Sequence, residues 1–404
     1  MNRDIQILRE LSRRYADLTQ QPHQQERRRQ WRGLNSLKPE RPLIYVRAFA
    51  WQEMPESQCQ CQDPFLRGFE NYLRERLFHS TLGDDFIYEP WLSLEATYKS
   101  RGWGVEIPHQ YSGVPGGSFK LDYPIREPED FSKLRFPRHE IDEAATQRNQ
   151  EKLTSAVGDL ITINLDRGPA YRMWAADLSS DLGYLRGIEN FMLDMMDRPE
   201  WLHRLLTFMR DGVLAAQEQA ERAGDWGLCD HQNQSMSYAL ELADPAANQR
   251  GVKRKQLWDF CASQEFALVG PELWNEFMLA YQKPIMEQFA LSAYGCCEDL
   301  TRKIPLLRQV RNLRRIAVSP FSDVAACVQQ IGRDYVISYR PSPADMVSYR
   351  FDEERVRSIL RRDLTSLRGC IFEVTLKDVE TVERDPNRVR RWVQITREML
   401  SQCA

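Results

Sequence analysis

The stretch LRRIAVSPFSDVAACVQQIGRDYVISYRPS, residues 313–342, decides the fold class of this chain. Two short apolar runs, LRRIAVSP (313–320) and YVISYRPS (335–342), flank a segment with helical periodicity. A buried strand, a helix and a second buried strand form the repeating unit of a parallel sheet. The stretch therefore predicts an α/β protein.

The same alternation extends outward in both directions. Further strand-like runs are RPLIYVRAF (41–49), DDFIYEPW (84–91), LITINLD (160–166), LSAYGCCE (291–298) and CIFEVTLKD (370–378). The clearest helical segments are 186–222, where Pro199 starts a new helix, 271–290 and 386–402. Alternation over about 360 residues predicts a closed (β/α)8 TIM barrel.

Two segments depart from this rhythm. Residues 4–32 form a basic amphipathic helix or helix pair, which we interpret as a cap on the bottom of the barrel with a solvated face. The alternative is a contact with RNA, a membrane or a partner protein. This gives an N-terminal helical extension over residues 1–40 and a barrel over residues 41–404. Residues 99–140 are rich in glycine and proline, and they predict a long loop insertion over the barrel mouth.

Composition narrows the range of partners. The 55 basic and 58 acidic residues give a net charge of −3, which predicts no general attraction to nucleic acid or anionic membranes. No apolar run is long enough to span a bilayer, and the charged N-terminus does not resemble a secretory signal. Nine cysteines in an odd count favour a reducing compartment, so we expect a cytoplasmic protein. Trp258, Trp274 and Trp392, if exposed, would permit a homodimer.

Candidate binding residues follow the predicted strands, because the C-terminal strand ends of a parallel barrel form its active-site face. The first predicted strand, within the run 41–49, ends at Arg47, and Arg167 follows the run 160–166. Two arginines facing one mouth suggest an anionic group on the substrate. Tyr294 and Tyr339 also lie at strand ends and are further substrate-binding candidates.

Adjacent cysteines at a strand end point to a metal. Cys296 and Cys297 are followed by Glu298, and zinc selects thiolate together with carboxylate or imidazole. Glu265 and Cys370 are possible companion ligands. The alternative is that both cysteines are small buried hydrophobic residues.

A second cluster carries proton-transfer candidates. His231 follows Cys229 and Asp230, and it is the only histidine within a group that bears thiol and carboxylate. Asp230, His231 and Glu298 are therefore the candidate catalytic groups. The sequence has no motif of the usual serine hydrolases, kinases or dinucleotide-binding enzymes following a strand.

Several segments together resemble the uroporphyrinogen decarboxylase superfamily, which also holds zinc-dependent, corrinoid-linked methyltransferases. RPLIYVRAFA looks like the first strand of that family, and ITINLDRGPAYRMW looks like a later strand with its glycine-proline turn. YGCCED stands where family members carry a His-x-Cys-Gly segment. The likeness covers roughly residues 41–400 in order.

The departures from the family pattern indicate which branch applies. A second arginine expected after Arg47 is missing, which argues against true porphyrinogen decarboxylation. Tyr294 replaces the zinc-binding histidine of the methyltransferase branch, whereas Cys296 keeps its cysteine. The resemblance implies a zinc-dependent methyltransferase that moves a methyl group between a small methylated substrate and a thiol or the corrinoid (cobalamin) of a partner protein. The alternatives are a metal-free decarboxylase or lyase, and a non-catalytic barrel that binds a cofactor.

Overall fold

Parallel strands organise the computed structural model, which describes residues 2–111, 113 and 119–403. Six strands form one parallel sheet in the order β1-β10-β9-β8-β7-β6. Two more pair in parallel as β2-β5. The strands are β1 Leu43–Val46, β2 Trp91–Glu95, β5 Thr162–Asp166, β6 Trp258–Cys261, β7 Leu291–Tyr294, β8 Leu313–Val318, β9 Val336–Tyr339 and β10 Phe372–Leu376. This confirms the α/β class and is consistent with a TIM-like fold.

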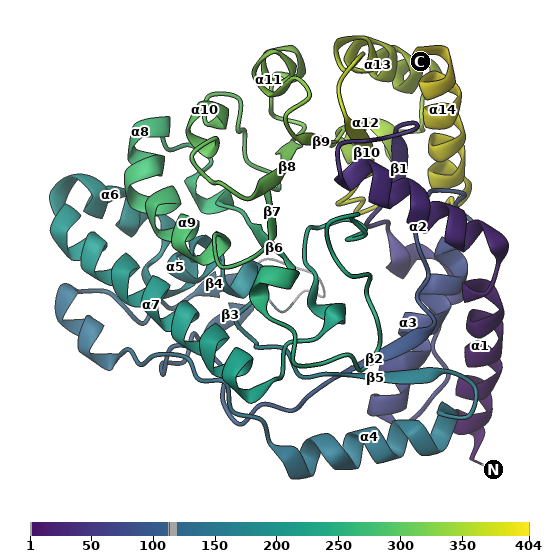
Figure 1. The fold of residues 1–404 in the computed structure, drawn as a ribbon, viewed down its shortest axis with the longest axis horizontal. Coiled ribbons are helices and arrows are strands. Elements are labelled where there is room, and N and C mark those ends of the chain that lie inside the picture. The colour runs from purple at the N-terminus through teal and green to yellow at the C-terminus, as the bar shows by residue number, and fades with distance from the viewer. Residues whose placement is uncertain (1, 112, 114–118, 404) are drawn as a thin grey trace.

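Helical segments connect the strands and cover the sheet (Figure 1). The helices are α1 Arg3–Thr19, α2 Pro22–Asn35, α3 Pro64–His79, α4 Glu143–Val157, α5 Ser179–Arg186, α6 Ile188–Asp197, α7 Pro199–Ala223, α8 Pro271–Trp274, α9 Ala280–Met286, α10 Ile304–Leu307, α11 Val324–Ile331, α12 Pro343–Val347, α13 Glu353–Ser366 and α14 Asn387–Cys403. Proline occupies the first turn of α7, as the sequence predicts.

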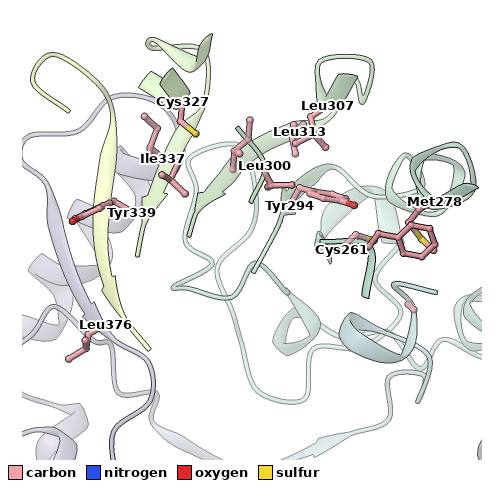
Figure 2. Packing of buried hydrophobic residues seen from close by; sticks show 14 of the residues in the cluster. Cys261, Met278, Tyr294, Leu300, Leu307, Leu313, Cys327, Ile337, Tyr339 and Leu376 are labelled. Atoms are coloured by element: carbon pink, nitrogen blue, oxygen red, sulfur yellow. The ribbon is translucent and has the colours of Figure 1, made fainter. Parts of the chain in front are cut away.

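Alternate residues of β8, β9 and β10 lie in two different environments. One set packs beneath the helices in the main hydrophobic core, and Figure 2 shows Ile337 and Leu376 among them. The other set includes buried polar groups. Arg315 donates to Glu373 at 2.5 Å and to the Asn35 side-chain oxygen at 2.6 Å. These three strands therefore carry one apolar face and one face with buried polar groups.

Helix α2 covers the N-terminal ends of several strands. Trp31 packs in a cluster with Leu43, Val336 and Ile371, each of which begins or precedes a strand. The Asn35 amide donates to the backbone oxygens of residues 236 and 238. These contacts support the interpretation of the basic segment as a cap, and its arginines form hydrogen bonds or ion pairs with nearby carboxylates and carbonyls.

Side chains cover the outer edges of β1 and β5. The Ile44 and Val46 amides donate to the carboxylates of Asp85 and Asp84. On the other side, the Leu165 amide donates to Asn248. Among the described residues, no strand ladder joins the six-stranded sheet to β2-β5.

Several sequence-based predictions need correction. The predicted strand 84–91 is irregular up to residue 90, and β2 begins where it was expected to end. Strand β6 was not anticipated from the sequence. The predicted helix 271–290 contains a π-helical turn, Asn275–Leu279, and ends at Met286.

The tryptophans proposed as exposed dimer contacts are all buried, namely Trp258, Trp274 and Trp392. Their indole rings fill the interior, so they offer no surface to a second subunit.

The insertion after β2 packs against neighbouring helices. It contains a short antiparallel hairpin, β3 His109–Tyr111 and β4 Phe119–Leu121. Trp103 donates to Asp181 of α5 at 2.6 Å, and Phe136 packs against Phe208 of α7. Among the helices of the described residues, none is long and apolar enough to cross a membrane.

The buried ion pair predicts a large stability effect. Arg315 is 2% exposed, so Glu373→Ala leaves its guanidinium without a carboxylate and should cost about 3–5 kcal/mol in unfolding free energy. Urea denaturation measures this change. Glu218→Ala, which breaks an exposed i,i+4 pair with Arg222, is the matched control and should have a far smaller effect. Equal losses in both variants would contradict the importance assigned to Arg315.

Candidate active site

A tight turn after β7 brings two thiols to the C-terminal edge of the sheet. Gly295 has a φ of +97°, a conformation that glycine adopts without strain. A Cβ at this position would lie 2.5 Å from the Leu300 side chain, so only glycine fits. Cys296 and Cys297 follow directly, with Cys296 buried and Cys297 half-buried.

Glu298 fixes the position of this turn. Its carboxylate accepts hydrogen bonds from the backbone amides of Cys296 and Ser263, both at 2.8 Å. Burial raises the pKa of this carboxyl, whereas the two amides favour its charged form. Glu298, predicted to be catalytic, is thus engaged in joining the loops after β6 and β7.

Lys377 lies between the two sulfurs. It follows β10, and its ammonium is 3.2 Å from the Cys296 sulfur and 3.0 Å from the Cys297 sulfur. The two sulfurs are 3.7 Å apart. Asp378 pairs with the same ammonium, and its Oδ2 lies 3.6 Å from the Cys297 sulfur. We call Cys296, Cys297, Lys377 and Asp378 the thiol site.

These contacts make Cys296 the acidic thiol. The hydrogen bond from Cys297, together with the charges of Arg340 and Lys377, lowers the pKa of Cys296 to about 5 against the opposing effect of burial. Arg340 follows β9 and donates to the Cys296 carbonyl at 3.0 Å. The hydrogen bond to Cys296 and burial raise the pKa of Cys297, so that this thiol keeps its proton. At neutral pH the site holds one thiolate beside one thiol.

An apolar wall borders the thiol site on another side. Cys296 packs in a cluster with Phe260, Met173 and Trp174, and the rings of Trp174 and Phe260 meet edge to face at 4.9 Å. A nucleophilic sulfur between cations and aromatic rings suits a substrate that has both a charged and an apolar part.

The predicted substrate-binding residues separate into two groups. Arg47 lies beside Lys377, because its amide donates to the Leu376 carbonyl. Its guanidinium has no hydrogen-bond or ion-pair partner among the described residues. Arg167 is already paired with Glu143 and Asp225. Tyr294 and Tyr339 are buried and donate to other side chains, Tyr294 to Gln282 and Tyr339 to Asp363.

Asp230 and His231, two of the predicted catalytic residues, have partners other than the thiols. Asp230 pairs with Arg172, which also binds Asp166 at the end of β5. Burial raises the pKa of Asp230 to about 7. His231 accepts from the Trp258 amide at the beginning of β6, and burial lowers its pKa to about 4, so its ring is neutral.

The remaining predicted metal ligands do not meet Cys296. Glu265 accepts a hydrogen bond from Ser179 of α5. Cys370 precedes β10, at the opposite end of the strand from Lys377, and lines a cavity with Arg41. Within the described part of the chain, no group of three or more histidine, cysteine, aspartate or glutamate side chains is arranged to hold a metal ion.

Sequence reasoning missed the roles of Lys377 and Arg340. Each directly follows a strand, which is the signal that identified Arg47. Spacing along the chain could not reveal that both would face Cys296, because the loops after β7, β9 and β10 converge only in the folded sheet.

The contacts of the thiol site predict how the rate of Cys296 alkylation depends on pH. Alkylation of Cys296 by iodoacetamide, followed by mass spectrometry of its peptide, should fall only as the pH drops through about 5. Lys377→Met removes a stabilising cation and should raise this midpoint by about one unit or more. Cys370→Ser is the control and should leave the profile unchanged. A wild-type midpoint near that of a free thiol would contradict the assigned thiolate.

Comparison with known proteins reveals similarity of fold only. No protein family profile matches the sequence, and no curated protein matches it significantly. A solved structure of a methyltransferase from Methanosarcina mazei superposes with a TM-score of 0.52, covering 92% of this chain and 98% of the other. The two sequences are 10% identical. The chain therefore has an α/β fold similar to that of a methyltransferase along nearly its whole length.

Proposed function

We propose that this chain is a methyl-transferring enzyme whose reactive group is the Cys296 thiolate. The single observation that carries the proposal is the position of Lys377, 3.2 Å from the Cys296 sulfur. A thiolate is a strong nucleophile toward a methyl carbon, and it needs no base once its pKa is low. The fold similarity to a methyltransferase supports the same reaction class.

The proposed chemistry is a displacement at carbon. The Cys296 sulfur attacks the methyl group of a small methylated substrate, and a sulfur–carbon bond forms. The bond from carbon to the leaving atom breaks, and that atom keeps both electrons. Loss of the thiolate charge weakens the hydrogen bond that raised the pKa of Cys297, so Cys297 becomes a better acid for the leaving atom.

Substrate recognition in this proposal uses two neighbouring surfaces. The unpaired Arg47 guanidinium would bind a carboxylate or similar anion, in line with the expectation from sequence. The ring of Trp174 beside Phe260 would hold the methylated end near the sulfur. A thiol acceptor, or the corrinoid of a partner protein, would take the methyl group from Cys296 in a second displacement. The sulfur–carbon bond would break, and the Cys296 sulfur would keep both electrons and leave as a thiolate.

The eight parallel strands are proposed to form a (β/α)8 barrel of the uroporphyrinogen decarboxylase superfamily type. The hydrogen bonds from the β1 edge to Asp84 and Asp85 support this arrangement, since that segment leads directly into β2. Asn248 lies in the segment that leads to β6, and its side chain forms hydrogen bonds with the backbone of β5. These bonds support the barrel arrangement at the β5 edge.

A decarboxylase or lyase is the second candidate. Asp230 has a pKa raised to about 7 by burial and lies beside Arg172. A carboxyl group that exchanges its proton near neutrality could stabilise a protonated intermediate. Release of carbon dioxide from a cyclic tetrapyrrole carboxylate, abolished in Asp230→Asn, would favour this candidate over methyl transfer.

Methyl transfer predicts a covalent product. Wild-type protein is incubated with isotopically labelled methyl donors that include a sulfonium carboxylate, a quaternary ammonium carboxylate, a methoxyaryl carboxylate and methylcobalamin. We expect label on the Cys296 peptide with at least one donor, and none in Cys296→Ser. Failure of every donor in protein that still reacts with iodoacetamide would contradict the proposal.

Zinc content is a separate prediction. Zinc would supply a Lewis acid to a thiol or methoxy substrate. The donor set does not fit it while Lys377 is protonated, because that ammonium lies within 3.2 Å of both sulfurs and pairs with Asp378. Elemental analysis of wild type and Cys296→Ser should thus find little zinc in either. About one equivalent in wild type, lost in Cys296→Ser, would restore Cys296 as a zinc ligand.

A further inference from the structure

A polar cavity opens beside the thiol site at the C-terminal ends of β8 and β9, and residues of α11 and α13 line it. Figure 1 shows where these strands and helices lie. Its volume is about 420 Å³, within the range of small-molecule sites. It is lined mainly by hydroxyl and guanidinium groups, including Ser319, Ser322, Ser342, Arg340, Arg355 and Arg362.

The charges that line the cavity leave one arginine without a carboxylate. Asp345 pairs with Arg355 at 2.5 Å, and Asp363 pairs with Arg362 at 2.7 Å. Arg340 has no carboxylate partner among the described residues. Its Nε donates to Ser338 and its Nη1 to the Cys296 carbonyl.

The lack of a carboxylate partner for Arg340 is significant because the residue is buried. Arg340 is 4% exposed, and a buried guanidinium is stabilised by an anion that satisfies its remaining donors. No partner is found for its Nη2 in the described parts of the chain. The more exposed Arg355 and Arg362 lie on α13 at the rim, where they would attract an anion and contact it through water or directly.

We propose that this cavity binds a small organic anion, a phosphate monoester or a carboxylate, with its charged group against Arg340 and its hydroxyl groups against the serines. This site is distinct from the proposed methyl-binding region beside Trp174, and the proposal does not depend on methyl transfer. Arg340 also donates to the Cys296 carbonyl, so the cavity adjoins the thiol site.

Isothermal titration of the full chain tests the proposal with glycerol 3-phosphate, malate and uncharged glycerol. We expect one of the two anions to bind and glycerol not to bind, and the preferred anion identifies the ligand class. Arg355→Met should weaken binding by about tenfold or more. Arg357→Met is the matched control, because Arg357 lies on the same helix but pairs with Glu398 of α14, and it should bind as wild type does.

Two further measurements guard against misfolding and misplacement. Ser358→Phe fills the cavity from α13 and should abolish binding while the far-ultraviolet circular dichroism stays unchanged. Binding that survives in Ser358→Phe, equal binding of glycerol, or absence of binding by both anions would each overturn the proposal.

Discussion

One carboxylate holds together the two loops on which the thiol site depends. Glu298 accepts from the amides of Ser263 and Cys296, which follow neighbouring strands. Gly295 makes the turn possible, and Glu298 fixes its far side. A loop whose backbone amides bond to a buried carboxylate is more rigid than a loop exposed to water. The Cys296 sulfur is therefore oriented before any substrate arrives.

The charges around the two adjacent cysteines explain why their thiols differ in pKa. Lys377 lies close to both sulfurs, whereas Arg340 contacts only one of the two cysteines, Cys296, through its backbone carbonyl. Two negative sulfurs 3.7 Å apart would repel each other, so one proton remains on Cys297. The pair thus combines a nucleophile and a proton donor in consecutive residues. An isolated cysteine in the same cavity would need a separate acid.

The sequence predicted the elements that carry strong local signals. The apolar runs around residues 313–342 and the proline before α7 identified strands and helices, because such patterns act within a few turns of chain. Cys296 was found as a candidate because strand ends of parallel sheets share one edge.

The rest of the site could not be derived from local pattern. Cys370 was grouped with Cys296, although the two lie at opposite ends of their strands. Arg167 looked available for substrate, but Glu143 and Asp225 bind it, and neither neighbours it in sequence. The partners of charged residues come from distant segments, so which ones remain free is decided only by the complete fold.

The strands β2 and β5 belong to a hydrophobic cluster of their own, because side chains and not strand ladders cover the edges of β1 and β5. Helices α1, α3 and α4 pack with β2 and β5 in a hydrophobic cluster separate from the main core. Backbone ladders do not extend from this cluster into the six-stranded sheet among the described residues. Cooperative units of unfolding follow contiguous packing and hydrogen bonding. We therefore expect the first helix of the chain to belong to a different unfolding unit from the sheet that bears Cys296.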